Sequence, residues 1–487
     1  MWKGSFMNVL QTVALSYSLL ALLVLPAAPS GAEAPTAPII HQTQPMHGDL
    51  AEMKKRKFVR VLVSASQTNF FLVNGRPYGF EYELAKKYER FLNTGVPKKE
   101  FQTHLLFIPV PFHRLIPELV AGKGDIAAGG LTIIPERQQQ VSFSDPYFSH
   151  VDEVVVSHKG MQEISHLDEL SGQVVFLVRG SSYVHHVQRV SDKLKRAGKA
   201  PIIITEADEV VEAEDILQIV NAGIYHRTVV DAHIAQLWAS VLPNIVVHDD
   251  LKIFSGGQIA WAVRKDNPAL RESLNAFMVQ HKKGTLLGNI FFKRYYHNTK
   301  WITNPLRKND QQKLNVLIPL FKKYGKLYGF DWRAIAALAY QESRLNNRKR
   351  SPRGAIGIMQ VLPQTARGRE VNIPDIENLE NNIHAGVKYL AHLRDHHFKD
   401  PQLGAAAQVN FVFAAYNAGP TRIQRLRTQA KKRGLNPNIW FDHVEEMALE
   451  YIGQETVQYV SKIHKYYIAY QLLEESPQKK KALRIGE

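Results

Sequence analysis

The sequence predicts a protein of more than one domain, an α/β domain followed by an all-α domain. The chain has 487 residues, which is too long for one compact core and suggests about two to four domains. Strand-like and helix-like segments alternate from residue 58 to about residue 297, which is typical of an α/β fold with mostly parallel sheets. From about residue 310 to residue 475 the spacing of apolar residues is nearly all helical.

Composition and charge narrow the class of protein. Hydrophobic residues make up 45% of the chain and charged residues 22%, which fits an ordinary folded protein. The absence of cysteine excludes disulfides, thiolate nucleophiles and thiolate metal sites. A formal net charge of +16 favours polyanionic partners such as nucleic acid, anionic lipid or an acidic cell-wall polymer, although a soluble, self-repelling surface explains it equally well.

The first 32 residues have the pattern of an export signal. Lys3 precedes an apolar run over residues 13–25, and small residues follow at Ser30 and Ala32. The run is short for a membrane span, so we expect a signal peptide, with an uncleaved N-terminal anchor and membrane association as the alternative. Export argues against nucleic acid as a partner, and the lack of cysteine excludes lipid attachment through that residue.

The rest of the chain divides where its composition changes. Residues 33–57 are interpreted as a linker that ends in the basic run KKRK, and the polar stretch 298–309 as a connector. We therefore expect an α/β domain over 58–297, a helical domain over 310–475 and a basic tail over 476–487. In the α/β domain the sequence predicts a helix over 79–93 and strands over 58–65, 103–110, 152–157, 173–182 and 244–250.

Four segments of the α/β domain carry a family resemblance. They are GRPYGFEYELAKKYERFLN (75–93), LVAGKGDIAAGGLTIIPERQQQVSFSDPYF (119–148), LVRGSSY (177–183) and WAVRKDNPALRESLNAF (261–277). These segments resemble the periplasmic solute-binding family that captures polar amino acids. The resemblance implies two lobes that close on a ligand, and the alternative is a spacer or docking domain whose cleft is unused.

The same resemblance implies which residues hold the ligand. The carboxylate-binding arginine of the family falls on Arg137 and its hydroxyl partner on Thr132, and an arginine fork matches a carboxylate through two parallel hydrogen bonds. The contact from the second lobe falls on Ser181 or Ser182, and the acid that binds the ligand's amine falls on Asp231. The expected ligand is a small amino acid or a muropeptide.

A glutamate stands on the apolar face of a predicted helix at AALAYQESRLNN (336–347). Ile335 and Leu338 precede Glu342 at helical spacing, and such a stripe normally faces a core, where a carboxylate is rarely buried without a partner. One explanation is a general acid, because burial disfavours the charged form and raises the pKa of a carboxyl. The other is a structural glutamate at the core edge, paired with Arg344 or another cation.

Four motifs around and after this glutamate carry a second resemblance. They are QESRLNNRKRSPRGAIGIMQVLPQTA (341–366), NIHAGVKYL (382–390), AAYNAGP (414–420) and GQETVQYVSKI (453–463). In this order they resemble the soluble lytic transglycosylase family, whose lysozyme-like fold cleaves peptidoglycan. The two domains together resemble the membrane-bound lytic murein transglycosylase F type. That type implies an exo-acting lyase in the periplasm, peripheral to the outer membrane of a Gram-negative bacterium.

The second resemblance implies the residues of the glycan site. Glu342 is the catalytic residue, acting first as acid and then as base, and the hydroxyl of Tyr459 is expected to reach its carboxyl. The implied substrate-binding residues are Ser343, Ser351, Met359, Gln360, Tyr416, Asn417 and Tyr459.

No second carboxylate occupies a motif position, whereas ordinary glycosidases use two. The resemblance implies that the muramoyl 6-hydroxyl attacks its own ring, which breaks the MurNAc–GlcNAc bond and leaves a 1,6-anhydro end. The alternatives are a lysozyme-type muramidase that uses water, and a non-enzymatic sensor that binds glycan or amino acid. No metal or cofactor is expected, and ligand binding in the α/β domain is a candidate modulator of cleavage.

The loop after the glutamate is strongly basic. Residues 344–353 carry five cations, and the loop is either simply solvated or attracts the stem-peptide carboxylates of peptidoglycan. The sequence slightly favours the second interpretation.

Overall fold

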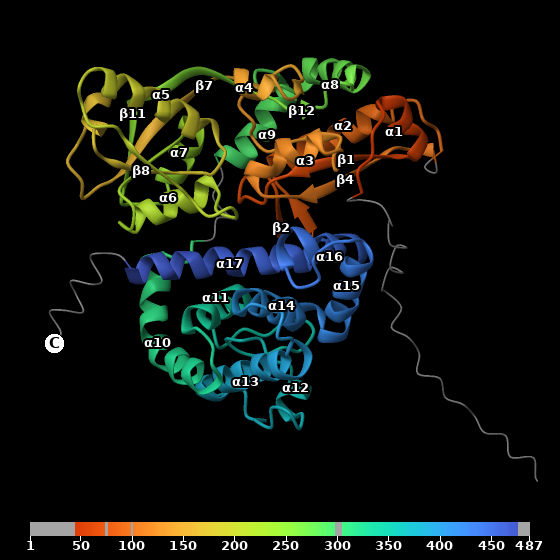
Figure 1. Cartoon of the computed structure of the whole chain (residues 1–487), viewed down its shortest axis with the longest axis vertical. Helices are drawn as coiled ribbons and strands as arrows, with labels where there is room; N and C mark the ends of the chain where they lie inside the picture. The colour runs from red at the N-terminus through yellow and green to blue at the C-terminus, as the bar shows by residue number, and fades with distance from the viewer. Residues whose placement is uncertain (1–43, 74–75, 99–100, 298–303, 476–487) are drawn as a thin grey trace, which may run out of the picture. The chain divides into compact units, whose positions relative to one another are not determined.

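The computed structural model describes residues 44–73, 76–98, 101–297 and 304–475 (Figure 1). The expected signal peptide or anchor, the first half of the connector and the basic tail lie outside the described residues. None of the helices in the described ranges combines the length and apolarity that crossing a bilayer requires.

The first lobe of the α/β region is built on a five-stranded sheet of order β4-β1-β5-β12-β6. The apolar β1 is buried along almost its whole length and pairs in parallel with β4 and β5, while β12 is antiparallel to β5 and β6. A short hairpin of β2 and β3 lies outside this sheet. The strands are β1 (Phe58–Val63), β2 (Phe71–Val73), β3 (Arg76–Tyr78), β4 (His104–Pro109), β5 (Ile126–Ala127), β6 (Ser142–Phe143) and β12 (Ala262–Val263).

The second lobe departs from the expected mostly parallel arrangement. Its main sheet has the order β10-β7-β11, and both outer strands run antiparallel to β7. Only β8 and β9, which are joined through α5, form a parallel pair. Alternation of strands and helices did not reveal this, because β7 enters the lobe from the first lobe rather than through a helical crossover. The strands are β7 (Phe148–His158), β8 (Val174–Leu177), β9 (Ile203–Glu206), β10 (Arg227–Asp231) and β11 (Ile245–Ile259).

The helices of the α/β region pack around these sheets, with α2 against β4, α8 and α9, and α7 against β7, β10 and β11. They are α1 (Leu50–Arg56), α2 (Phe80–Leu92), α3 (Leu115–Val120), α4 (Pro135–Gln138), α5 (Ser182–Arg196), α6 (Ala213–Asn221), α7 (Ala232–Ala239), α8 (Pro268–His281) and α9 (Leu286–Tyr296).

Part of the predicted linker is folded. Residues 50–56 form α1, whose first turn is closed by a capping box between Asp49 and Glu52. Met53 is fully buried, and Arg56 forms an ion pair with the buried Asp125. The basic run therefore lies at the end of a helix attached to the first lobe.

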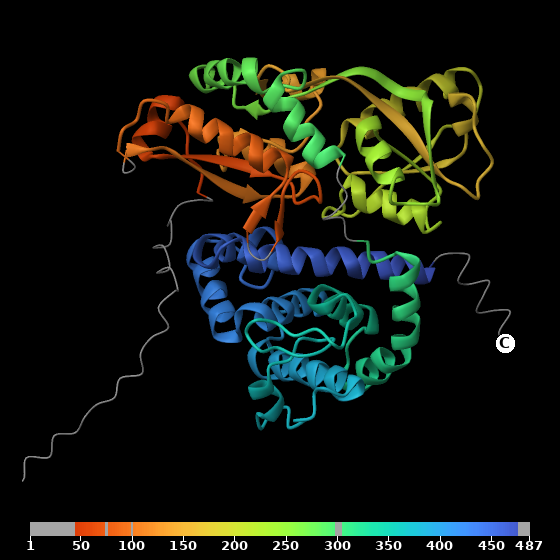
Figure 2. The ribbon, with the colours of Figure 1, turned by 180° about the vertical axis from the view of Figure 1, so that it is seen from behind.

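The region from residue 304 to residue 475 is helical, as expected (Figure 2). Its helices are α10 (Lys308–Tyr328), α11 (Trp332–Ser343), α12 (Pro363–Arg367), α13 (Leu379–His397), α14 (Ala405–Ala418), α15 (Pro420–Lys432), α16 (Glu445–Ile452) and α17 (Gln454–Glu475). A kinked helical turn over Trp440–Val444 precedes α16.

The last helix, α17, packs along α11 and α14. The rings of Tyr340 on α11 and Tyr466 on α17 meet edge to face with centroids 4.9 Å apart. The hydroxyl of Tyr467 also donates a hydrogen bond to Asp331, the residue that caps α11. These contacts fix the position of α17 relative to the last turn of α11, where the candidate acid lies.

Candidate active site

Glu342 lies in the last turn of α11. Asp331 starts this helix by accepting a hydrogen bond from the backbone N–H of Arg333 at 2.9 Å, and Arg344 ends it in a left-handed conformation with φ 55°. The helix is an alanine-rich segment whose residues 334–340 are all buried, so its final turn is rigidly held. Glu342 itself is half-buried.

The carboxyl of Glu342 has the pKa of an acid that keeps its proton near neutrality. Burial raises its pKa from the usual 4.5 to about 7. Two groups oppose this rise: the hydroxyl of Tyr459, which donates to Oε1 at 2.5 Å, and the nearby cation of Lys349. Arg344, the cation proposed as a structural partner, forms no ion pair with Glu342.

No second carboxyl acts on Glu342 within the described residues. The two side chains that shift its pKa, Tyr459 and Lys349, are a phenol and an amine. In two-carboxylate glycosidases the partner acid lies about 5–9.5 Å away, close enough to influence the first. Among the described residues, the groups that shift this pKa therefore include no second acid.

The loop after α11 is folded back against the helix by polar side chains. Ser343 is buried, and its hydroxyl donates to the carbonyl of Ile358 at 2.8 Å. The Oγ of Ser351 accepts from the backbone N–H of Ala355 at 2.9 Å. Both residues shape the backbone of the loop. The Ser343 hydroxyl is already used as a donor, whereas the Ser351 hydroxyl only accepts and keeps its proton available to a sugar.

Asn382, which the sequence analysis did not single out, holds the loop at its centre. It is fully buried, accepts from the backbone N–H of Met359 at 2.9 Å and donates to the carbonyls of Ile356 and Ile376. Its amide fills the space beside Gly357, which has a φ of 82°. The signal for it in the sequence was its position as the polar first residue of the motif NIHAGVKYL.

Met359 and Gln360 differ in position. Met359 is fully buried and packs against Gly386, so it belongs to the core and is not exposed as the implied substrate-binding residue would be. Gln360 is half-buried, and its amide donates to the carbonyls of Gly357 at 2.8 Å and Lys349 at 3.1 Å.

Tyr416 and Asn417 end α14 beside the acid. The hydroxyl of Tyr416 donates to the carbonyl of Met359 at 2.8 Å, and its pKa is raised by burial and by the charge of Glu342. Asn417 is exposed, and its side-chain oxygen accepts from Thr456 at 2.8 Å, which ties α14 to α17. The structure thus brings Tyr416 and Tyr459 close to Glu342, whereas the recorded partner of Asn417 is Thr456.

The basic loop is partly neutralised. Arg350 pairs with Glu377 at 3.1 Å, and the Nζ of Lys349 donates to the backbone carbonyl of Glu342. The described ranges contain no group of three or more His, Cys, Asp or Glu side chains placed to hold a metal ion.

The cleft between the lobes of the α/β region contains most of the expected ligand residues. Thr132, Ser181, Ser182 and Asp231 line a cavity of about 40 Å³. The two serine hydroxyls are used within the protein, because Ser181 donates to the carbonyl of Val178 and Ser182 donates to Glu153. A cavity of this size holds a few water molecules, so the lobes must separate before an amino acid can enter.

Arg137 does not line this cleft. Its guanidinium donates to the carbonyl of Thr132 at 2.8 Å and to that of Gly180 at 3.1 Å, so its donors join the two lobes directly. The expected fork toward a ligand carboxylate is occupied by these backbone oxygens. The resemblance implied that this arginine binds a ligand carboxylate, but in the closed arrangement of the lobes its donors are directed to backbone oxygens.

The ionisable side chains that face the cleft include three carboxyls, and burial raises the pKa of each of them. Glu212, Glu214 and Asp231 line it, and no arginine or lysine is among the described lining residues. The Oδ1 of Asp231 lacks a hydrogen-bond partner in the described part of the chain, and burial raises the pKa of this carboxyl well above its usual value. Burial also lowers the pKa of His233 to about 3, so this side chain is neutral.

Two protein families match separate parts of this chain, and several known proteins match most of its length. Residues 59–296 match the bacterial extracellular solute-binding proteins, family 3, and residues 319–439 match the transglycosylase SLT domain. A membrane-bound lytic murein transglycosylase F from Desulfosudis oleivorans is 29% identical over 435 residues, covering 86% of this chain and 91% of that protein. A protein of the same name from Pseudomonas fluorescens is 29% identical over 437 residues, covering 86% and 85%.

Solved structures resemble the α/β region. An ancestral arginine-binding protein bound to arginine is 28% identical, with a TM-score of 0.41, and the match covers 49% of this chain and 98% of that one. The P235GK mutant of ArgBP from T. maritima is 25% identical, with a TM-score of 0.42, covering 51% and 99%. The chain therefore carries an extracellular solute-binding domain of family 3 followed by a transglycosylase SLT domain, and the two relatives above, which match most of its length, are named membrane-bound lytic murein transglycosylase F.

Proposed function

We propose that this protein is a peptidoglycan lytic transglycosylase in which Glu342 is the only acid–base residue. The observation that carries this proposal is the half-buried Glu342 carboxyl with a pKa of about 7, held by Tyr459 and free of a second acid among the described residues. The SLT match and the curated relatives support the reaction class.

The geometry suits a two-step proton transfer. Protonated Glu342 donates to the glycosidic oxygen of the MurNAc–GlcNAc bond, as a carboxyl with raised pKa does in lysozyme. The carboxylate then accepts the proton of the muramoyl 6-hydroxyl, which bonds to the anomeric carbon of its own ring. Tyr459, as a donor to the carboxylate, stabilises the charged form that exists between the steps.

Mass spectrometry of the products from purified peptidoglycan tests this function. The expected products end in 1,6-anhydromuramic acid and carry no added water. Reducing ends would instead support a muramidase that uses water, and no cleavage would support a glycan-binding sensor. The result also shows whether products come from strand ends, as the expected exo-acting enzyme requires.

The α/β domain is proposed to bind a small ligand with an ammonium group, such as an amino acid or a muropeptide. The unpaired carboxyl oxygen of Asp231 and the absence of described cations on the cleft wall support this chemistry. Because Arg137 is bound to backbone oxygens, a ligand carboxylate would have to displace these contacts or be met by backbone N–H groups. Thermal unfolding with amino acids and with muropeptides tests binding, since only a ligand that prefers the folded state raises the melting temperature.

Asp231→Asn is the variant for this binding experiment. The amide keeps the volume of the side chain but cannot take up the negative charge that a bound ammonium group would stabilise, so it should abolish the ligand-induced rise in melting temperature. Asp249→Asn, an exposed acid on β11, is a matched control that should keep the full rise. If no amino acid or muropeptide raises the melting temperature of the unmodified protein, the domain does not have this function.

Ligand binding is also proposed to modulate cleavage. The start of α6 supports a physical route: Glu212 and Glu214 line the cleft, while Asp215 pairs with Lys465 of α17 at 3.0 Å. The same helix, α17, carries Tyr459. A movement of α6 on ligand binding would therefore act on a helix that contacts the catalytic acid.

The site of action is proposed to be the periplasm, on the outer membrane. The name of the relatives, membrane-bound lytic murein transglycosylase F, supports membrane association, and the signal-like pattern of residues 1–32 supports export. Glycan strands are the expected macromolecular partner, and nucleic acid is not.

A further inference from the structure

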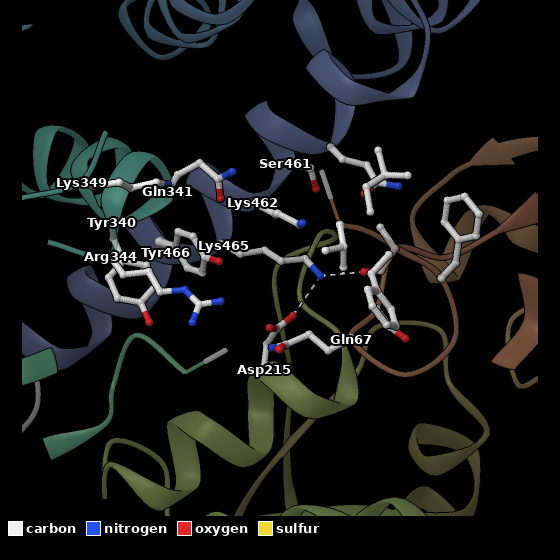
Figure 3. A pocket seen from close by; sticks show the side chains of 17 residues that line it. Gln67, Asp215, Tyr340, Gln341, Arg344, Lys349, Ser461, Lys462, Lys465 and Tyr466 are labelled. Atoms are coloured by element: carbon white, nitrogen blue, oxygen red, sulfur yellow. Dashed lines mark hydrogen bonds and ion pairs between the residues drawn. The ribbon is translucent and has the colours of Figure 1, made fainter. Parts of the chain in front are cut away.

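A basic cavity lies beside the last turn of α11. It has a volume of about 280 Å³ and is lined by α11, α17 and the segment 65–73 (Figure 3). Four cations line it and one acid, Asp215, opposes them; the cations are Arg344, Lys349, Lys462 and Lys465. All four cations belong to the helical region, so this charge is a property of the domain that carries Glu342.

Two of the four cations have partners. Lys465 pairs with Asp215 at 3.0 Å and donates to the carbonyl of Ala65 at 2.9 Å. Lys349 donates to the backbone carbonyl of Glu342. Asp215, the one acid that lines the cavity, thus neutralises Lys465. The positive charges of the other lining residues have no acid in the cavity to balance them.

Lys462 and Arg344 lack partners. Within the described chain, neither side chain forms an ion pair or a hydrogen bond, and Figure 3 shows both at the same cavity. Burial, with Lys465 and Arg344 close by, lowers the pKa of Lys462 to about 8. A half-buried cation beside other cations is unfavourable unless an anion binds to it. The arrangement of Lys462 and Arg344 is therefore that of an anion-binding site.

The cavity adjoins the catalytic acid. Tyr340 and Gln341, which line it, directly precede Glu342 in α11, and Lys349 contacts both the cavity and the backbone of Glu342. Its volume is close to the lower end of the roughly 300–1,000 Å³ of small-molecule pockets, which suits the end of a peptide and not a glycan strand. The amides of Gln341 and Gln458 and the rings of Tyr340 and Tyr466 offer contacts for a peptide backbone.

We propose that this cavity binds a carboxylate of the stem peptide attached to the muramoyl residue whose glycosidic bond is cleaved. The inference rests on the proposed transglycosylase function, because that function places an acidic peptide on the ring beside Glu342. Lys462 and Arg344 bind the carboxylate through charge-assisted hydrogen bonds. The enzyme then prefers strands that carry peptides over strands that do not.

The experiment compares two substrates with the full-length protein. One is purified glycan strands with stem peptides, and the other is the same strands after an amidase has removed the peptides. For each variant kcat/KM is measured on both, and their ratio gives the peptide preference. In Lys462→Gln the ratio should fall roughly ten- to hundredfold, as expected for the loss of one charge-assisted hydrogen bond.

Two further variants make this result specific. Lys462→Arg keeps the charge and should retain most of the preference. Lys431→Gln removes the same charge from an exposed position on α15 and should leave the ratio as in the unmodified protein. If Lys462→Gln does not fold, Arg344→Gln, at an exposed residue of the same cavity, tests the same site.

The outcomes separate this proposal from the proposed function. An unchanged ratio in both Lys462→Gln and Arg344→Gln overturns the anion site while leaving the transglycosylase activity in place. Released peptide added to stripped strands should not restore their cleavage rate; if it does, the occupant is a free peptide and the tethered one is excluded. An unmodified protein that cleaves neither substrate overturns the function itself, and this proposal with it.

Discussion

The hydroxyl of Tyr459 donates a hydrogen bond to Oε1 of Glu342 at 2.5 Å, across 117 positions of the chain. This contact joins the last helix to the end of α11 and sets the balance of the site. Burial favours the protonated acid, and the phenol favours the carboxylate. The carboxyl therefore titrates near the pH at which an acid–base residue must both give and take a proton.

Glu342→Gln should abolish cleavage while the fold stays intact. The amide has nearly the volume of the carboxyl but can neither donate a proton to the leaving oxygen nor accept one from the 6-hydroxyl. General acid–base groups supply about 10²–10⁴-fold each, and here one group serves both steps, so the loss should lie at or beyond the upper end. Product release and circular dichroism are measured together. Glu455→Gln, an exposed glutamate on α17, is the matched control. Near-normal activity in Glu342→Gln would mean that another residue is the acid.

Tyr459→Phe should move the alkaline limb of the pH–rate profile to higher pH. The lost hydrogen bond stabilised the carboxylate, so its removal raises the pKa of Glu342, and the acid keeps its proton to a higher pH. A hydrogen bond to a charged group is worth about 1.5–3 kcal/mol, which corresponds to a shift of roughly one unit or more. A limb that stays in place, with the fold unchanged, would show that the phenol does not control this titration.

Glu342→Gln should also change the pH dependence of stability. In the unmodified protein the folded state holds the Glu342 proton up to a pH of about 7, whereas the unfolded chain releases it near 4.5. Because the folded state binds more protons in this window, the unfolding free energy falls as pH rises from 4.5 to 7. The unfolding free energy of the variant does not fall in this way, because glutamine does not titrate. The variant should therefore be more stable than the unmodified protein at pH 8 by roughly 2–3 kcal/mol, with little difference at pH 4. Denaturant unfolding at both pH values measures this; parallel curves for the two proteins would contradict the raised pKa.

Gly357→Ala should destabilise the catalytic loop much more than Gly354→Ala. Both glycines have a positive φ, of 82° and 81°, so alanine costs about 1–3 kcal/mol of backbone strain at either. A Cβ at Gly357 would in addition lie 2.2 Å from the amide nitrogen of Asn382, whereas a Cβ at Gly354 would have nothing within 4 Å. Melting temperature and cleavage rate should both fall further in Gly357→Ala. Equal losses in the two variants would mean that the packing of Asn382 does not position the loop.

Asp215→Asn should weaken the dependence of cleavage on ligand. The amide removes the charge that pairs with Lys465, and so interrupts the contact between α6 and α17. Cleavage is measured across the binding range of a muropeptide or amino acid that raises the melting temperature, in the unmodified protein and in the variant. Equal rates with and without that ligand in the unmodified protein would refute coupling between the domains.

The sequence predicted the helical half better than the α/β half. The apolar stripe around Glu342 predicted a carboxyl in a desolvated position, because helical spacing alone fixes which side chains share a face. The hydrogen-bond partner of that carboxyl, Tyr459, comes from α17, and here only the order of the motifs pointed to it. The burial of Met359 was not predictable, because it depends on how closely Gly386 approaches from α13.

In the α/β half, one local signal in the sequence was not recognised, and other features depend on contacts between the two lobes. Asp49 and Glu52 have the spacing of a capping box, and this signal could have identified α1 inside the predicted linker. The contacts of Arg137 could not be predicted, because they depend on Gly180 in the other lobe and hence on how far the lobes close. The antiparallel pairing of the strands in the second lobe could not be predicted either, because the direction of pairing depends on how the chain connects the two lobes.

The packing of α17 on α11 decides how short an active fragment of this protein can be. The SLT match ends at residue 439, but Tyr459, Tyr466 and Tyr467 all come from a helix that begins at residue 454. A chain trimmed to the matched residues would leave Glu342 hydrated on the side that α17 covers, and its pKa would fall back toward 4.5. Such a fragment would carry an ionised acid at neutral pH even if its remaining helices folded, whereas one that runs from about residue 310 to residue 475 keeps the acid and its phenol together.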